Sequence, residues 1–298
     1  EGRLMAQVAL PTRRDEAWKW SDLRQAYGAE VPAADPALAQ SPVIVQLAHA
    51  GQAYGCLTVE AEADEVRAEQ LTAPGREAAA LDVTVAPGAS LTRILVQDAP
   101  DISLNYAKVR LGAGARFRQF VLSFGARFAR IETDILVEGE GAEVSLHGMY
   151  LLGEGRHADF TSQVRHNAPG AVTRQLVKGA VRRGGRGVFQ GKLYVGREAQ
   201  KTDARQHHQG LLLDEGAEID AKPELEIYAD DVACAHGNTI GALDEAALFY
   251  MRSRGLPAAQ ARALLIEAFL REAAPEWLPP QAAQDLEARL SAWLGDRP

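Results

Sequence analysis

Residues 137–152 read V-E-G-E-G-A-E-V-S-L-H-G-M-Y-L-L, a glycine corner followed by an apolar, strand-like run. Related segments are V-A-P-G-A-S-L-T-R-I-L-V at 85–96, R-L-G-A-G-A-R-F-R-Q-F-V-L at 110–122 and H-N-A-P-G-A-V-T-R-Q-L-V at 166–177. Their turn glycines are Gly88, Gly114, Gly141 and Gly170, spaced by 26, 27 and 29 residues. A period of this length is typical of a stacked repeat.

Each repeat contains a second strand-like run before its glycine corner, at 104–111, 131–138 and 160–166. Glycine adopts backbone conformations that other residues resist, and the small alanine after it lets one coil pack on the next. Because a single coil cannot bury its own apolar face, neighbouring coils must stack. The similar coil lengths favour a mainly β, parallel β-helix, with a meander or sandwich as the alternative. No long amphipathic pattern interrupts residues 81–230, which disfavours a doubly wound α/β fold.

The segments before the repeats are less regular. Aromatic residues in Pro11–Tyr27 predict a short helix or helical hairpin, and residues 28–42 have the Ala and Pro content of a linker. Further on we expect strands at Val43–Val45 and Cys56–Val59 and a helix at Asp64–Ala73. The predicted organisation is an N-terminal helical segment and linker at 1–42, a β-helix core at 43–241 and a C-terminal helical domain at 242–298.

The last part of the chain has a helical period. Asp244 can cap a helix that runs to about Arg254, where Gly255 ends it. Pro257 then opens a second helix, and a third is expected from about Gln281 to Trp293. The remaining apolar residues of these helices either cover the end of the solenoid or face a partner.

Composition narrows the functional classes. The net charge of -8 argues against binding to nucleic acid or to an anionic membrane, both of which need a basic surface. No apolar stretch approaches the roughly 18 residues of a spanning helix, and residues 1–10 lack the pattern of a secretory signal. Two cysteines, Cys56 and Cys234, make no disulfide framework, so we expect a reducing cytoplasm.

The motif Cys234-Ala235-His236 places a thiol and an imidazole two residues apart. On a strand, both side chains point to the same face. Both are ligands for zinc, iron and iron–sulfur centres, but two ligands do not complete a site, so the others would come from another chain. The alternative is a structural one, in which a buried cysteine lies beside a hydrogen-bonded histidine.

Other chemistry has weaker support in the sequence. A Cys–His nucleophile would need an orienting acid and an oxyanion hole. Asp230 and Asp231 are close in sequence, but residues on one strand cannot all converge on a substrate. His207 and His208 are adjacent and face opposite ways on a strand, so a polar solenoid face is favoured over a chelate. No phosphate-binding loop is present. A β-helix enzyme acting on polysaccharide would use clustered carboxylates and arginines, which no spacing marks here.

The region around the Cys–His pair resembles the C-terminal signature of the SufB/SufD family of the Suf iron–sulfur cluster assembly machinery. The matching runs are K-T-D-A (201–204), L-L-L (211–213), A-K-P-E-L-E-I-Y-A-D-D-V-A-C-A-H-G (221–237), L-F-Y-M-R-S-R-G (248–255) and, near the start, P-T-R-R-D-E-A-W-K-W-S-D-L (11–23). The C-x-H-G form is similar to that of the SufD branch. Ala235 and Asn238 stand where Ser and Ala are usual in the family.

The resemblance implies a right-handed parallel β-helix between helical ends and a non-catalytic scaffold role. It implies a partner SufB, paired edge to edge with the last strands, and two copies of the ATPase SufC, bound by the helices at about 243–272. The expected SufC-contacting residues are Asp244, Phe249, Tyr250, Arg252 and Arg254. His236 and Cys234 are then candidate ligands of iron or of a transient iron–sulfur cluster shared with SufB. A homodimer without a cluster role is the alternative within the family.

Overall fold

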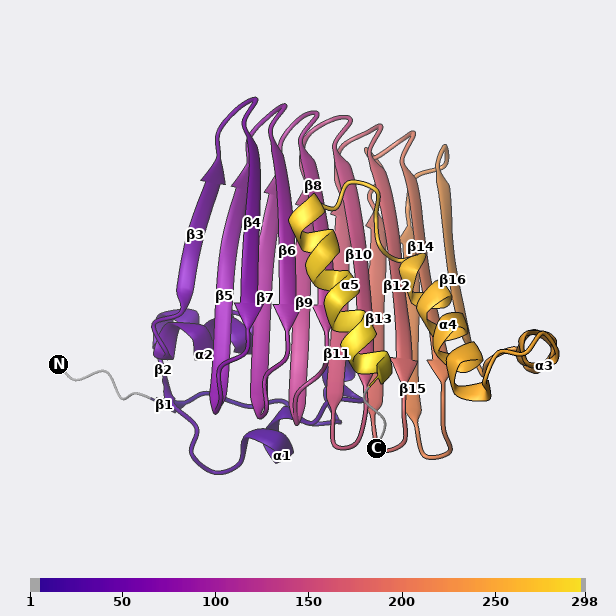
Figure 1. Ribbon diagram of the computed structural model, residues 1–298. Coiled ribbons are helices and arrows are strands. Elements are labelled where there is room, and N and C mark those ends of the chain that lie inside the picture. The colour runs from indigo at the N-terminus through magenta and orange to yellow at the C-terminus, as the bar shows by residue number, and fades with distance from the viewer. Residues whose placement is uncertain (1–5, 296–298) are drawn as a thin grey trace.

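The computed structural model describes residues 6–295, and its central body consists of two seven-stranded parallel sheets (Figure 1). The sheet named here the odd sheet contains β3 (Tyr54–Val59), β5 (Arg76–Val85), β7 (Ile102–Leu111), β9 (Phe128–Val137), β11 (His157–His166), β13 (Arg186–Val195) and β15 (Glu218–Ile227). The even sheet contains β4 (Asp64–Leu71), β6 (Ser90–Gln97), β8 (Arg116–Ser123), β10 (Glu143–Leu152), β12 (Val172–Val181), β14 (Asp203–Leu212) and β16 (Ala233–Gly241). A small antiparallel pair, β1 (Ala6–Gln7) and β2 (Ala33–Ala34), precedes them.

Successive strands alternate between the two sheets, so each odd strand and the even strand after it form one coil. Within each sheet, every strand pairs in parallel with the strand of the next coil. The chain is therefore a parallel β-helix with helices near both ends, which confirms the predicted mainly β solenoid. Residues 1–5 and 296–298, the outer ends of the predicted terminal segments, lie outside the described residues.

Glycine corners set the length of the coils. Gly114 and Gly141 have φ of 63° and 68°, in the left-handed region that residues with a side chain rarely adopt. At Gly139 the reason is steric instead. A Cβ there would lie 1.9 Å from the backbone nitrogen of Ala113 in the previous coil. The corners thus bring neighbouring coils into backbone contact, as the recurrent glycines predicted.

The interior between the sheets is mostly apolar, with layers of Val, Leu and Phe from successive coils. One row of inward-facing side chains is polar at every position except Leu146. In register from coil to coil, the even sheet places Arg67, Arg93, Gln119, Leu146, Gln175, Gln206 and His236. We call these residues the inner row. Several of them hydrogen-bond across the interior to the odd sheet, as Gln119 does to Thr133 at 3.0 Å and Gln175 to Ser162 at 2.8 Å.

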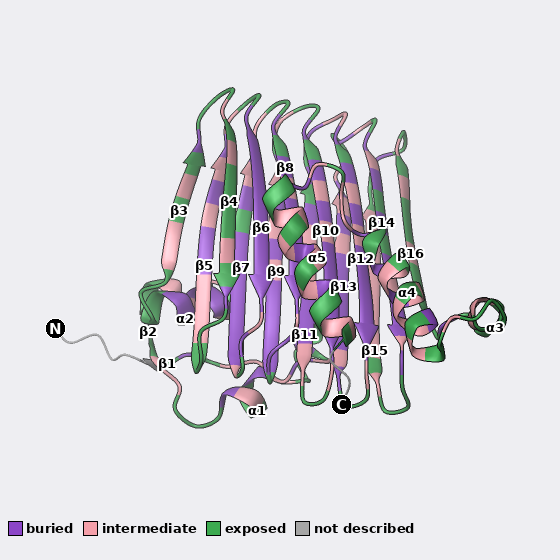
Figure 2. Ribbon diagram, in the orientation of Figure 1, coloured by how far each residue is buried: buried purple, intermediate pink, exposed green. Residues whose placement is uncertain are grey.

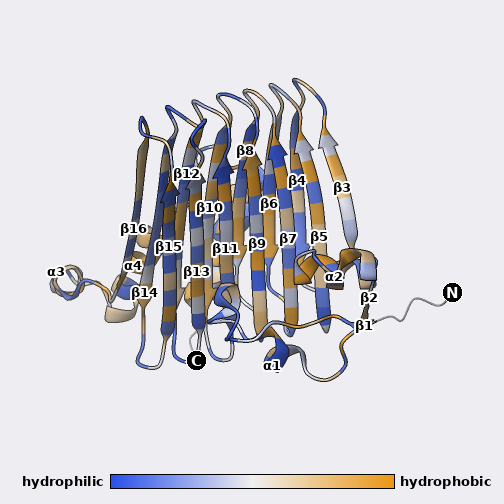
Figure 3. Cartoon of the chain, turned by 180° about the vertical axis from the view of Figure 1, so that it is seen from behind, coloured by the Kyte–Doolittle hydropathy of each residue, from blue (hydrophilic) through white to orange (hydrophobic). Residues whose placement is uncertain are grey.

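Residues 11–27, named here the N-terminal strap, cross the outer face of the odd sheet (Figure 3). The strap contains a 3-10 helix (Glu16–Trp18) and the short helix α1 (Leu23–Tyr27), which accords with the predicted short helical segment packed on a larger body. Its contacts reach the last coil, where Glu16 forms an ion pair with Lys222 at 2.7 Å. The strap therefore ties coils together that are far apart in sequence.

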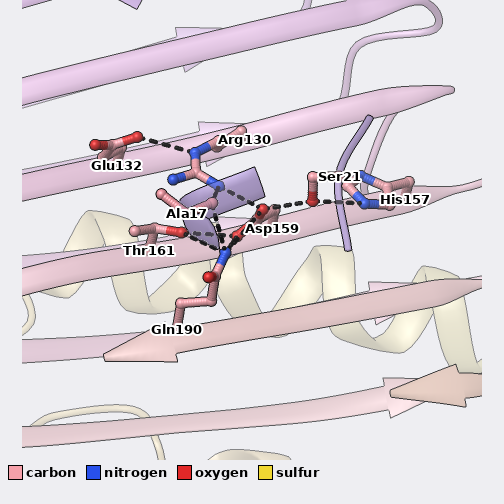
Figure 4. A network of polar contacts seen from close by, with 8 residues as sticks. All are labelled: Ala17, Ser21, Arg130, Glu132, His157, Asp159, Thr161 and Gln190. Carbon is pink, nitrogen blue, oxygen red and sulfur yellow. Dashed lines mark hydrogen bonds and ion pairs between the residues drawn. The ribbon is translucent and has the colours of Figure 1, made fainter. Parts of the chain in front are cut away.

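A buried network of hydrogen bonds and ion pairs attaches the centre of the strap to the odd sheet (Figure 4). Arg130 and Asp159 form an ion pair of 2.8 Å in which neither side chain is exposed. Arg130 also donates to the carbonyl of Ala17 at 2.8 Å and lies 4.0 Å below the ring of Trp18, while Ser21 donates to Asp159 at 2.5 Å. Because a buried charge is stable only when it is paired and hydrogen-bonded, the strap and the sheet depend on each other here.

Three helices follow the last coil: α3 (Glu245–Ser253), α4 (Ala258–Arg271) and α5 (Pro280–Gly295). The predicted capping by Asp244 is confirmed, because its carboxylate accepts the backbone N–H groups of Ala246 at 2.8 Å and Ala247 at 3.2 Å. Helices α4 and α5 pack against apolar residues on the outer face of the even sheet. They cover that face rather than the end of the solenoid, where α3 projects away from the body (Figure 1).

Two expectations for the residues just before and within the first coil are wrong. Val43–Val45 belong to the helix α2 (Val43–Ala50), whose residues Ile44, Val45, Leu47 and Ala48 are buried beside the odd sheet. Asp64–Ala73, expected as a helix, contains the strand β4, which pairs with β6 along its whole length. In both cases packing against a neighbouring coil outweighs local propensity. The first strand of the solenoid, β3, begins at Tyr54 and includes the predicted strand Cys56–Val59.

We predict that Asp159→Asn destabilises the protein by about 3 kcal/mol, because it leaves the buried guanidinium of Arg130 without its fully buried partner. The free energy of unfolding in urea measures the effect. Glu143→Gln is the matched control, since Glu143 pairs with Arg116 at 3.3 Å on the surface with both side chains about half exposed, and such pairs contribute at most about 1 kcal/mol. Equal losses in the two variants would contradict the role given to the buried pair.

Candidate functional site at the open end of the solenoid

The last coil, formed by β15 and β16, is the exposed end of the solenoid. Both strands stand at the end of their sheet, and each has a hydrogen-bonded neighbour on one side only. The middle strands are largely buried, whereas β15 is half-buried and β16 mostly exposed (Figure 2). The inward-facing side chains of this coil therefore stand at the open end of the solenoid. We call these side chains the rim.

Cys234 and His236 lie together at the rim. They are in register with Ala204 and Gln206 of β14, so both face inward, as their spacing on a strand predicted. Cys234 is half-buried against the apolar core, and this burial raises the pKa of its thiol. His236 is exposed and makes no hydrogen bond within residues 6–295. The pair is accessible from the end of the solenoid rather than sealed in the interior.

The pair alone would be too small a ligand set to hold a metal. Within residues 6–295, no group of three or more His, Cys, Asp or Glu side chains is placed to hold a metal. Cys56 cannot contribute, because it lies on β3 at the opposite end of the odd sheet. Asp231 is close in sequence but forms an ion pair with Lys201. A metal or cluster at the rim would need ligands from outside this chain.

The raised pKa of Cys234 disfavours the alternative of a Cys–His nucleophile, which needs a thiolate at neutral pH. A second grouping has the residue types of a hydrolase, since the hydroxyl of Ser21 lies 2.5 Å from Asp159 and 3.3 Å from Nε2 of His157. Ser21 is only 1% exposed, and Asp159 is neutralised by Arg130. This grouping therefore fastens the strap rather than presenting a nucleophile to a substrate.

Hollows on the surface lie away from the Cys–His pair. One of about 710 Å³ is beside the start of α4 and the end of α5, and another of about 340 Å³ lies between the strap and the odd sheet. The second is lined by carboxylates and by Arg130, Lys192 and Lys222, the composition expected of a polysaccharide-cleaving site. Each of these three basic groups already has an acidic partner among the described residues. This pairing disfavours the polysaccharide alternative.

His207 and His208 face opposite sides of β14, so the expectation that they form no chelate holds. The expectation of a polar outer face holds only for His207, which is exposed. His208 is fully buried, stacked on Phe189 with a centroid distance of 4.7 Å, and bonded through Nε2 to the hydroxyl of Tyr150 at 2.7 Å. Its Nδ1 lies 2.6 Å from Oδ1 of Asn238 at the rim, and burial lowers its pKa to about 4.

The helix α3 carries the residues expected to contact a partner. No residue of α3 is buried, and Phe249 and Tyr250 are 74% and 59% exposed. Arg252 and Arg254 are exposed at the end of the same helix, with the guanidinium of Arg254 5.2 Å from the ring of Tyr250. Asp244 serves first as the helix cap. The five residues lie on one short, uncovered element, while what they contact stays a prediction.

Sequence reasoning missed two residues next to the Cys–His pair, Gln206 beside the rim and Asn238 at the rim. Neither has a residue type that signals a site, and Gln206 lies 30 positions before His236. Only the pairing of β14 with β16 places them beside the Cys–His pair. The periodic coil length was the one signal from which this register could have been derived.

Comparison with known proteins places this geometry in a family. The family description "SUF system FeS cluster assembly, SufBD core domain" matches residues 49–269, which include the rim, α3 and most of α4. The chain belongs to the SufBD core family. The family resemblance seen in the sequence is thereby confirmed. No helix within residues 6–295 has both the length and the apolar character needed to cross a bilayer.

Individual proteins of this family are similar to the chain in sequence. The iron–sulfur cluster assembly protein SufD of Escherichia coli is 34% identical over 192 residues, covering 64% of this chain and 45% of that protein. A SufBD family protein of Synechocystis is 34% identical over 193 residues, covering 64% of this chain and 43% of its own length. A SufBD family protein of Mycobacterium tuberculosis is 29% identical over 250 residues, covering 80% and 63%. This SufBD chain spans less than half the length of the first two.

We predict that this SufBD chain loses stability on acidification between about pH 6.5 and pH 4, in part through His208. Its pKa is about 4 in the folded protein and about 6.5 in an unfolded chain, so the unfolded state binds more protons in that window. The contribution is complete above the unfolded value and declines as pH falls, by up to about 3 kcal/mol.

Urea unfolding from pH 7 to pH 4.5 tests this. His208→Gln is expected to show a shallower decline than the wild type, while His207→Gln, on the exposed outer face of the same strand, should match the wild type. Parallel declines in wild type and His208→Gln would contradict the assignment.

Proposed function

We propose that this chain is a non-catalytic scaffold subunit of the Suf iron–sulfur cluster assembly system, acting in the cytoplasm with SufB and the ATPase SufC. The observation that carries the proposal is half of a ligand set, Cys234 and His236, at the open edge of a parallel sheet in a SufBD family member. A site of this kind is completed by a second protein, and an exposed strand is the means of joining one.

The rim suits pairing with a strand of SufB. Along β16 the only residue with an ionisable side chain besides Cys234 is His236, whereas β4, the other end strand of the even sheet, carries Asp64, Glu65, Arg67 and Glu69. Charged edge strands resist pairing with another chain, and uncharged ones permit it. Large apolar side chains add to the surface at this end of the molecule, where Ile227, Tyr228 and Ile240 are 40%, 52% and 37% exposed.

The cargo in this proposal is iron or a nascent iron–sulfur cluster, held between the two chains while it forms. Thiolate and imidazole are both used as ligands of such clusters. Metals bind the thiolate form of cysteine. Because the pKa of Cys234 is raised, its thiol loses its proton to a metal less readily, so His236 is the stronger ligand candidate of the two. SufB would supply the remaining ligands.

The helix α3 suits the docking of SufC. A nine-residue helix with no buried residue and two largely exposed aromatic rings gains stability when its apolar face enters a groove of a partner. α3 connects to α4, which packs on β12, so a displacement of the helices by SufC would be transmitted to the even sheet and its edge. ATP-driven dimerisation of SufC is the proposed source of that displacement.

Replacing His236 with Ala tests the ligand role. We expect cluster formation in a reconstituted complex with SufB and SufC to fall at least about tenfold, because the imidazole has no substitute at the rim. The measurements are iron and sulfide content and the visible absorption of the cluster. His207→Ala, an exposed histidine on the neighbouring strand, is the control. An unchanged cluster yield in an intact His236→Ala complex would remove His236 from the mechanism.

Replacing Phe249 with Glu tests the docking helix. The charge should weaken SufC binding at least about tenfold, since it replaces an exposed aromatic anchor in the contact. Glu245→Gln, at the exposed first turn of α3, is the matched control. Titration calorimetry gives the affinities, and native mass measurement distinguishes a complex with SufB and SufC from a homodimer. Full SufC affinity in Phe249→Glu would place the contact elsewhere.

A further inference from the structure

Gln206 is a buried side chain with one unused acceptor beside the rim. Its residue is 0% exposed, and its Nε2 donates across the interior to the carbonyl of Gly191 at 3.1 Å. Its Oε1 is buried and has no hydrogen-bond partner within residues 6–295. Leaving a buried acceptor unsatisfied costs roughly 1–3 kcal/mol, so an available donor next to it would be used.

The neighbour of Gln206 at the rim is His236. The two residues are in register on β14 and β16, next to each other in the inner row. Adjacent strands lie about 4.8 Å apart, which lets an imidazole N–H and an amide oxygen on neighbouring inward positions meet. The other row neighbour, Gln175, directs one N–H of its Nε2 to Ser162 at 2.8 Å and has an unpartnered Oε1 of its own. The imidazole of His236 makes no hydrogen bond among the described residues, so it is the neighbour with the freer donor.

The same two strands already contain a contact of this kind. His208 and Asn238 are the next inward-facing pair in register, and Nδ1 of His208 lies 2.6 Å from Oδ1 of Asn238. The amide oxygen accepts there from an imidazole on the neighbouring strand. Gln206 and His236 stand in the same register relation, with the amide and the imidazole exchanged between the strands.

We propose that His236, which is unbonded in the conformation described, turns its imidazole to donate a hydrogen bond to Oε1 of Gln206. This bond fixes the tautomer of His236, so that the other ring nitrogen presents its lone pair to the open end of the solenoid. The hydrogen bond made by one imidazole nitrogen decides which nitrogen is free to bind a metal. Gln206 is thus a positioning residue for His236. The consequence for iron or cluster binding rests on the proposed function, whereas the fixed tautomer does not.

The imidazole ¹⁵N chemical shifts of His236 test the proposal in the chain alone at pH 8, where imidazoles are neutral. In the wild type we expect the two ¹⁵N shifts of one fixed tautomer. In Gln206→Leu we expect the shifts of both ring nitrogens to move toward the average of the Nδ1–H and Nε2–H tautomers. If Gln206→Leu does not fold, Gln206→Met is used in its place. Unaltered shifts in the variant that removes the acceptor would overturn the proposal.

Gln175→Leu is the matched control, since it removes the same amide from the same row one coil farther from the rim. Its His236 spectrum should equal that of the wild type, and a changed spectrum would overturn the proposal by showing a general effect of the core.

Cluster formation in the complex separates this proposal from the proposed function. Gln206→Leu should lower it about tenfold and Gln175→Leu should leave it unchanged. If Gln206→Leu allows both tautomers of His236 and still gives the full cluster yield, Gln206 remains the positioning residue but the ligand role of His236 is contradicted.

Discussion

Backbone hydrogen bonding between coils is the constraint on which the rest of the structure depends. Each strand of a parallel sheet satisfies its N–H and C=O groups on both neighbours, so every coil needs another on either side. The glycine corners make this possible because they hold the coils at nearly constant length, and register is kept from β3 to β16. The same constraint leaves the last coil, among residues 6–295, with a neighbouring strand on one side only, and this free edge carries the candidate site.

Constant register also explains why a row of polar side chains runs through the interior and ends at the rim. A side chain at one inward position lies directly beside the same position of the next coil, so the inner row extends from Arg67 to His236 through a largely apolar core. Along it, each polar group must find a partner across the interior or in the next coil. At the rim the row ends on a residue with solvent on one side and Gln206 on the other.

The two outer faces of the solenoid are covered in different ways, and this leaves the end as the uncovered surface. The odd sheet is crossed by the N-terminal strap, which depends on the buried pair of Arg130 and Asp159. The even sheet is covered by α4 and α5 through apolar contacts. Neither cover extends over β16 or α3, whose exposure follows from their place at the end of the repeat.

The sequence by itself determined the solenoid, the C-terminal helices with the Asp244 cap, the family and the common direction of Cys234 and His236. These depend on glycine spacing, capping and the two-residue period of a strand, all of which are local. Only the tertiary structure decided that residues 43–50 are helical and 64–71 a strand, that His208 is buried, and that Gln206 lies beside His236. The physical reason is that each of these outcomes depends on what the next coil presents, about 30 residues away along the chain, and no local pattern reports it.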